Sequence, residues 1–183
     1  MTEWTWERIE TESTPPEVSV SICLRGDLVA EHDRLETELR RVRDEDDAEN
    51  RVPLAPQIAS KIRDLEDQIR DAEVEFRFRG VGRKTLTDLT AAHPATAEQQ
   101  EQVGGDGLRM EWNPDTYPPA LVAASCVQPA GVTVERAAHA YETWSHGQWS
   151  KLWRACISAN MGSADPGPKS VLASLVLQGS AQN

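Results

Sequence analysis

A phosphate-binding loop is the first chemistry that the sequence suggests. Gly80-Val81-Gly82-Arg83-Lys84-Thr85 follows an alternating apolar segment and precedes a short helical pattern, where the loop of a nucleotide-binding domain would lie. The spacing does not fit. A GxxxxGK[ST] loop centred on Lys84 needs glycine at Phe78 and Arg83, and without these glycines the backbone amides cannot curl around a phosphate. The segment therefore predicts a strand-to-helix turn with exposed basic residues.

Histidines and cysteines could supply a metal site or a nucleophile. The sequence contains His32, His93, His139, His146, Cys23, Cys126 and Cys156. They form neither an HExxH pair nor a CxxC pair, so neither a metal site nor a disulfide framework is indicated. His139 and Cys156 could meet across two helices, but no local pattern marks an activated nucleophile. We therefore expect no catalytic residue, metal or cofactor, with His32 half-buried and His146 at a helix start.

Tryptophans are the other residues that could carry function, as anchors for a binding partner. Trp149, Trp153 and Ile157 fall on one helical face. An aromatic stripe at helical spacing usually packs into the core, and the sequence favours this interpretation. The alternative is an exposed groove for an apolar helix of a partner, in which tryptophan is a strong anchor. On that alternative the partner-binding residues are Trp112, Trp144, Trp149, Leu152, Trp153 and Ile157. Trp4 and Trp6 are harder to bury and could dock on a neighbouring molecule.

Two periodicities organise the first half of the chain. Val18, Val20, Ile22 and Leu24 alternate with polar or small residues and predict a strand. Residues 28–42 and 58–72 then carry apolar residues at steps of four and three, which predicts a coiled-coil-like antiparallel helical hairpin. The two seams are Leu28, His32, Leu35, Leu39 and Val42, and Ile58, Ile62, Leu65, Ile69 and Ala72. Residues 43–57, with an acidic run and two prolines, predict a loop.

A second strand should close this unit. Val74, Phe76 and Phe78 alternate with charged residues directly after the hairpin. Because the two helices run antiparallel, the strands on either side of them should also be antiparallel and could pair. Residues 18–81 are therefore predicted to form a β-α-α-β unit.

The second half predicts a small helical bundle over residues 82–160. Helices are expected over 83–92, over 120–127, from the cap Thr133 to Trp144, and from the cap Ser145 to Asn160. Residues 95–107 predict a flexible loop, residues 1–17 a mobile segment and residues 161–183 a flexible tail. The predicted fold class is α+β, mainly α: a two-strand antiparallel unit with an inserted helical hairpin, followed by the bundle.

Charge and hydropathy exclude some functions. The 183 residues include 30 acidic and 19 basic ones, a net charge of -11 that would repel phosphate backbones. We therefore expect no nucleic-acid partner. No apolar run approaches the roughly 20 residues of a membrane span, and the start of the chain is not basic. The expected location is the cytoplasm.

The second half also shares its order of turns and apolar positions with a known family. Phe76-Arg77-Phe78 precedes Gly82-Arg83-Lys84, which opens a short helix ending at Ala92-His93-Pro94. Next come Asn113-Pro114-Asp115-Thr116-Tyr117-Pro118-Pro119-Ala120-Leu121-Val122-Ala123-Ala124-Ser125-Cys126, Thr133-Val134-Glu135, Ser145-His146-Gly147-Gln148-Trp149 and Asn160. With the closing Pro168-Lys169-Ser170, this order resembles tail assembly chaperones of long-tailed phages and prophages of actinobacteria. The predicted hairpin is a departure from the shorter members of that family.

The resemblance implies a non-enzymatic protein that binds the long, helical tape measure protein. It would keep that partner soluble in the bacterial host cytoplasm while the tail tube polymerises, and would be absent from the finished virion. A longer frameshifted form of itself and a homo-oligomer are further candidate partners. An acidic surface suits this role because it can keep a less soluble partner dispersed. The alternatives are a structural or adaptor protein of a phage tail or tail-like particle, and a small enzyme or nucleotide-binding regulator.

Overall fold

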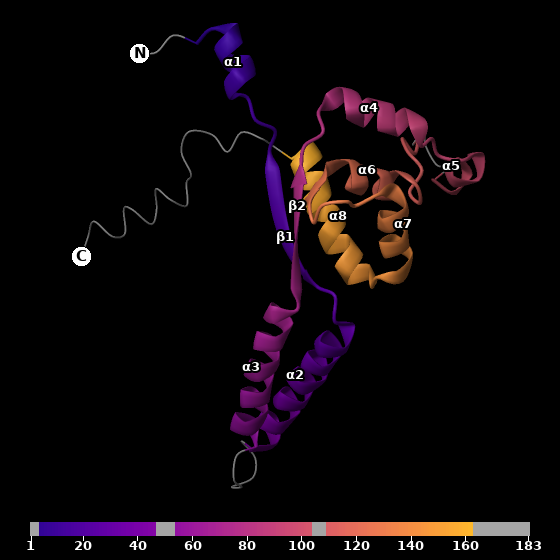
Figure 1. The fold of residues 1–183 in the computed structure, drawn as a ribbon. Helices are drawn as coiled ribbons and strands as arrows, with labels where there is room; N and C mark the ends of the chain where they lie inside the picture. The colour runs from indigo at the N-terminus through magenta and orange to yellow at the C-terminus, as the bar shows by residue number, and fades with distance from the viewer. Residues whose placement is uncertain (1–3, 47–53, 104–108, 163–183) are drawn as a thin grey trace, which may run out of the picture.

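The computed structural model describes residues 4–46, 54–103 and 109–162, and these form an α+β fold that is mainly helical, as predicted. The elements are α1 (Trp6–Glu12), β1 (Glu17–Cys23), α2 (Gly26–Asp46), α3 (Ala55–Asp71), β2 (Glu73–Arg79), α4 (Arg83–Ala92), α5 (Ala97–Val103), α6 (Tyr117–Ser125), β3 (Cys126–Gln128), α7 (Val134–Thr143) and α8 (His146–Met161). Figure 1 shows a body built from the sheet and α4 to α8, from which the α2–α3 hairpin projects at one end and α1 at the other.

The sheet has one buried and one polar face, because its side chains alternate along the strands. β1 pairs antiparallel with β2, with Val18 opposite Phe78 and Ile22 opposite Val74. On the other face Glu17 forms an ion pair with Arg79, at 2.6 Å between Oε1 and Nη2. The predicted pairing is thus confirmed, although β1 ends at Cys23 and Leu24 beyond it is 40% exposed.

A third strand corrects the prediction of two strands. The apolar helix expected over 120–127 begins at Tyr117 and ends at Ser125, and Cys126–Gln128 then pair antiparallel with β2. Pro118 and Pro119 fit the first turn of α6, where a missing N–H costs no hydrogen bond. A continuous apolar run contains no periodicity that marks where a buried helix gives way to a strand.

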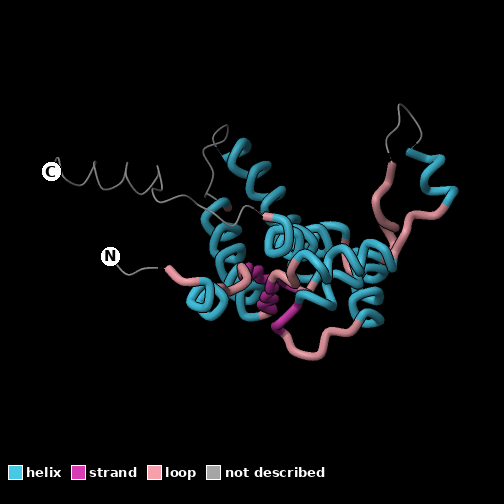
Figure 2. The backbone as a smooth tube through the Cα atoms, turned by 90° about the horizontal axis from the view of Figure 1, so that it is seen from above, coloured by secondary structure: helices cyan, strands magenta, loops and turns pink. Residues whose placement is uncertain are grey.

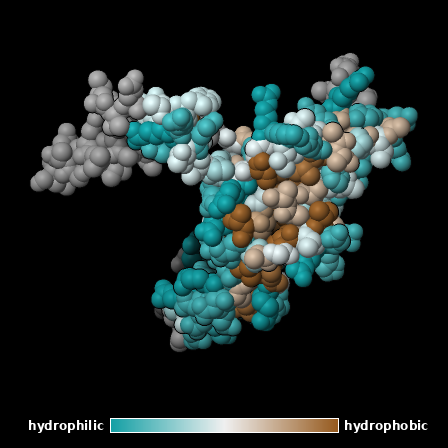
Figure 3. All heavy atoms as spheres, turned by 45° about the horizontal axis from the view of Figure 1, so that its top comes forward, coloured by the Kyte–Doolittle hydropathy of each residue, from teal (hydrophilic) through white to brown (hydrophobic). Residues whose placement is uncertain are grey.

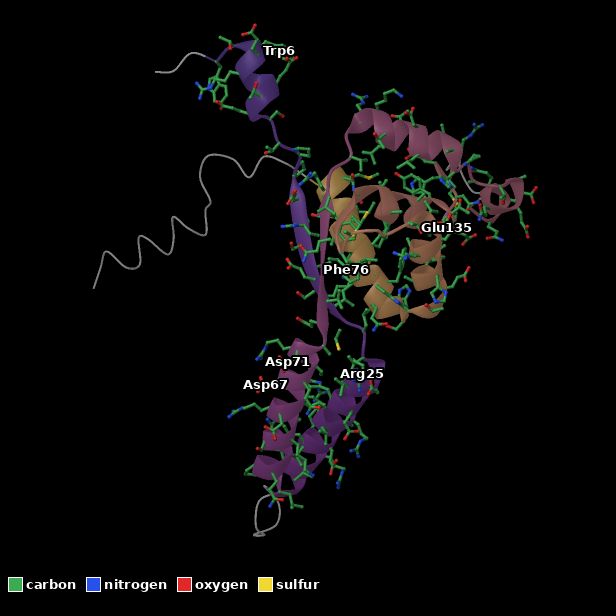
Figure 4. All side chains as sticks on the ribbon, viewed as in Figure 1. Trp6, Arg25, Asp67, Asp71, Phe76 and Glu135 are labelled. Atoms are coloured by element: carbon green, nitrogen blue, oxygen red, sulfur yellow. The ribbon has the colours of Figure 1, made fainter. Side chains whose placement is uncertain are left out.

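The helical hairpin has its own small core, as its two seams predicted. The buried residues are Leu35, Val42, Ile58, Ile62 and Leu65, with Leu28, Leu39 and Ile69 packed against them. Both helices extend into the loop predicted over 43–57, of which residues 47–53 lie outside the described part of the chain. Pro56 is tolerated because it falls in the first turn of α3. Figure 4 shows Asp67 and Asp71 on the side of α3 that faces away from α2.

The body has a single hydrophobic core that crosses the predicted domain boundary at residues 81 and 82. Ile22 and Phe78 of the strands belong to the same cluster as Leu121 of α6 and Leu152 of α8. The helices of the body lie on one side of β1 and β2, where α8 contacts both strands (Figure 2). The strands are therefore part of the body, whereas the hairpin packs around a separate core.

Two short helices occupy segments that were predicted to be irregular. α1 lies within the predicted mobile segment and is capped by Thr5, whose hydroxyl accepts a hydrogen bond from the Arg8 amide. α5 lies in the predicted loop and begins with reciprocal hydrogen bonds between Thr96 and Gln99, a capping box. The predicted C-terminal tail lies outside the described residues from residue 163 onward.

Candidate functional site

The turn before α4 forms hydrogen bonds with two distant parts of the chain. The Gly80 amide donates to the Pro16 carbonyl and the Val81 amide to Asn160 Oδ1, both at 3.0 Å. A Cβ at Gly80 would lie 2.8 Å from the Ala159 carbonyl oxygen, and Gly82 has a φ of +80°. Glycine is therefore required for close packing and for a backbone conformation that other residues rarely adopt. Two of the amides that a phosphate would need already have partners.

The structure does not join His139 to Cys156. Cys156 is fully buried, and its Sγ lies 3.3 Å from the Ser125 hydroxyl, whereas His139 is exposed on α7. Burial raises the pKa of the Cys156 thiol to about 12, so the thiol is protonated and a poor nucleophile at neutral pH. In the described ranges no three His, Cys, Asp or Glu side chains gather closely enough to hold a metal ion.

Some of the six predicted partner-binding residues belong to the core. Trp149 is 7% exposed and Leu152 is 2% exposed. Trp144 is half-buried and lies edge-on to Phe76, with 5.8 Å between ring centroids. These side chains face inward, as the favoured interpretation expected, and in this conformation they offer little surface to a partner.

Trp112 and Trp153 instead form a half-buried cluster around Tyr117. Trp112 stacks on Tyr117 at 4.8 Å between centroids, and Trp153 meets both rings edge-on. Tyr117 is fully buried, and its hydroxyl has no hydrogen-bond partner in the part of the chain that the structure describes. A buried hydroxyl without a partner is costly, and such an atom calls for an explanation.

Tyr117 also lines a groove of about 770 Å³ along α4, which we call the α4 groove. Its walls include Leu86 and Ala91 of α4, Met110 and Met161. Gln100 of α5 positions the opposite wall, because its side-chain amide exchanges two hydrogen bonds with the backbone of Met110. Met161 at the end of α8 is 55% exposed. Figure 3 shows hydrophobic side chains gathered on the surface of the body, bordered by hydrophilic ones.

The chemistry of the α4 groove is that of a binding surface. Most of its lining is apolar, and the charged residues on it are Arg83, Arg109 and Glu111. An apolar hollow with a few polar groups can accept the apolar face of an amphipathic helix. Of the six predicted partner-binding residues, Trp112 and Trp153 reach this region through Tyr117. Leu86, Met110 and Met161 were not anticipated, because no local pattern links three segments so far apart in sequence.

Comparison with known protein families, curated proteins and solved structures finds no match. The motifs that carry the resemblance to tail assembly chaperones can nevertheless be located in the fold. The backbone carbonyl of His93, the residue that follows α4, accepts a hydrogen bond from the Asn113 amide at 2.8 Å. Asn113 Oδ1 in turn accepts from the amides of Asp115 and Thr116, just before α6. Two of the motifs thus meet beside the α4 groove. No helix in the described residues is both long and apolar enough to cross a membrane.

Proposed function

We propose that this protein is a tail assembly chaperone, which binds the tape measure protein and keeps it soluble while the tail tube assembles. The observation that carries the proposal is the α4 groove, an open hollow with a mostly apolar lining that includes Leu86, Met110 and Met161. Amphipathic helices bind by laying their apolar face into such a groove.

The charges around the groove indicate the kind of helix that would bind. Arg83 and Arg109 are exposed and have no ion pair to any described residue. Acidic side chains beside the apolar stripe of the partner would pair with them, whereas the strongly acidic remainder of the chain repels other acidic surfaces. The preferred segment is therefore an amphipathic helix with glutamate or aspartate flanking its apolar face.

Co-expression with the tape measure protein tests the proposal. We expect the soluble fraction of that protein to rise with this chain and to fall when the groove is charged by Met161→Glu or Ala91→Glu. Both positions are exposed, so the fold should persist. Thr85→Glu on α4 adds the same charge outside the groove and is the matched control. If solubility does not depend on this chain, the chaperone role is wrong; if Thr85→Glu acts like Met161→Glu, the groove assignment is wrong.

The projecting hairpin supports a second candidate, a structural or adaptor protein of a phage tail or tail-like particle. Its exposed surface carries ion pairs between Arg34 and Glu31 and between Arg70 and Asp67. A charged arm of this kind could link two larger components. The two candidates differ in outcome, because an adaptor remains in purified particles and a chaperone does not.

A further inference from the structure

β1 is a sheet edge, and no strand among the described residues pairs with its outer side. It stands first in the strand order β1-β2-β3. Apart from its ladder with β2, the backbone of residues 17–22 makes no hydrogen bond to any described residue. Ser19 is exposed, and Val18 and Val20 are half-buried. An edge strand of seven residues without proline is a template for another strand.

The sequence of this edge is complementary to itself. If two copies pair antiparallel about a two-fold axis at Val20, Val18 lies opposite Ile22 of the second copy and Ser19 lies opposite Ser21. Glu17 then faces Cys23, so no like charges oppose each other and all seven residues are paired. In this register the apolar residues of both copies stay on the buried face. A shift of the register by one residue would place them opposite the polar face of the other copy. Centring on Ser19 instead would bring Pro15 and Pro16, which lack N–H donors, into the ladder.

The same two-fold pairing brings together two apolar surfaces that a single chain leaves exposed. The segment entering β1 in one copy lies beside the segment leaving β1 in the other. In Figures 1 and 2, α1 lies beyond the start of β1 and on the side of its free edge. It carries Trp6, 72% exposed and pointing away from the body in Figure 4. At the other end of β1, Leu24 and Val29 are 40% and 39% exposed.

We propose that this protein forms a two-fold symmetric dimer in which β1 pairs antiparallel with β1 of a second copy, with each α1 packed against the base of the other hairpin. Val29 and Ile69 line a hollow of about 270 Å³ at that base, which can receive an aromatic ring. A stable interface buries roughly 1,200 to 2,000 Å². One seven-residue ladder supplies less, so α1 completes the interface. The dimer leaves the α4 groove outside the contact and does not depend on the proposed chaperone role.

Four double variants, which place charges of either sign at positions 19 and 21, test the pairing in the full chain. Ser19→Lys/Ser21→Glu and Ser19→Glu/Ser21→Lys each place opposite charges across the two-fold axis. Ser19→Lys/Ser21→Lys and Ser19→Glu/Ser21→Glu place like charges there. Within one chain, position 19 faces Arg77 and position 21 faces Glu75. Ser19→Lys/Ser21→Glu is therefore unfavourable inside the chain but favourable across the dimer, which separates folding from association.

Sedimentation velocity at low salt measures how strongly each variant dimerises. We expect the unmodified chain and both opposite-charge variants to dimerise, and both like-charge variants to associate at least about tenfold more weakly. Trp6→Ala should weaken the dimer about tenfold or more, because tryptophan anchors dominate interfaces. If the unmodified chain is monomeric at every concentration, the inference is wrong. The inference is equally wrong if the affinity of the dimer is the same in all four variants. It is also wrong if only Ser19→Glu/Ser21→Lys associates, because association would then follow the stability of the single chain.

Discussion

Val81 and Asn160 are 79 positions apart and are joined by a hydrogen bond of 3.0 Å from the Val81 amide to the Asn160 side-chain oxygen. The same side chain donates to the Cys156 carbonyl at 2.8 Å. Asn160 therefore couples the turn after β2 to the last turns of α8. The contact therefore holds the start of α4 close to the end of α8, and both helices contribute walls of the α4 groove.

Asn160→Ala should destabilise the body. The substitution leaves the partly buried Val81 amide without a partner, and an unpaired buried donor costs about 1–3 kcal/mol. Urea unfolding followed by circular dichroism measures the loss. Ser158→Ala, at an exposed position of the same helix, is the control and should change the free energy of unfolding by less than about 0.5 kcal/mol. Equal effects of the two substitutions would show that the hydrogen bond contributes nothing.

Ile62→Ala should loosen the hairpin and leave the body intact. Ile62 is 6% exposed in a core of five buried side chains that is separate from the core of the body. Truncating such a residue costs about 2–5 kcal/mol, which a core this small cannot absorb. Hydrogen exchange should therefore accelerate in α2 and α3 but not in α6 or α8. Lys61→Ala, on the exposed side of α3, should leave both patterns unchanged.

Cys156 should make the protein less stable at alkaline pH. Burial raises its pKa from 9.0 to about 12, so between these values the unfolded chain loses the thiol proton and the folded chain keeps it. Stability therefore falls as pH rises through this window, by up to about 1.4 kcal/mol per pH unit, and is unaffected by this group below it. Urea unfolding from about pH 8 to about pH 11 should show a shallower decline for Cys156→Ala. Burial also raises the pKa of the half-buried Cys126 thiol, so Cys126→Ala should remove a smaller part of the decline than Cys156→Ala does.

The hairpin and the first two strands could be predicted because their signals are local. The seam containing Leu35 and the seam containing Ile62 repeat at helical spacing, and the alternation around Val20 marks a strand with one buried face. α5 carried a detectable signal as well, since Thr96 and Gln99 have the spacing of a capping box. β3 carried none, because three residues are too few to establish a period.

The α4 groove could not be predicted in this way. Its walls come from α4, the segment at Met110 and the end of α8, which meet only through tertiary packing. The sequence indicated the tryptophans as candidate binding residues, but it could not show which of them are buried in the core. Trp149 fills the core, whereas Trp153 reaches the groove region through Tyr117. Tyr117 itself was part of the family motif, but an unpaired hydroxyl cannot be deduced from a sequence.

Tyr117→Phe should separate stability from binding. The hydroxyl is buried without a partner among the described residues, so removing it should leave the free energy of unfolding unchanged or raise it by about 1–3 kcal/mol. The same substitution should leave the capacity to keep the tape measure protein soluble unchanged, because the buried hydroxyl is out of reach of a helix bound in the groove. Tyr141→Phe, a half-buried tyrosine that packs edge-on against Trp149, is the control and should change neither property. Destabilisation by Tyr117→Phe would mean that the hydroxyl has a hydrogen-bond partner in the folded protein, outside the described residues.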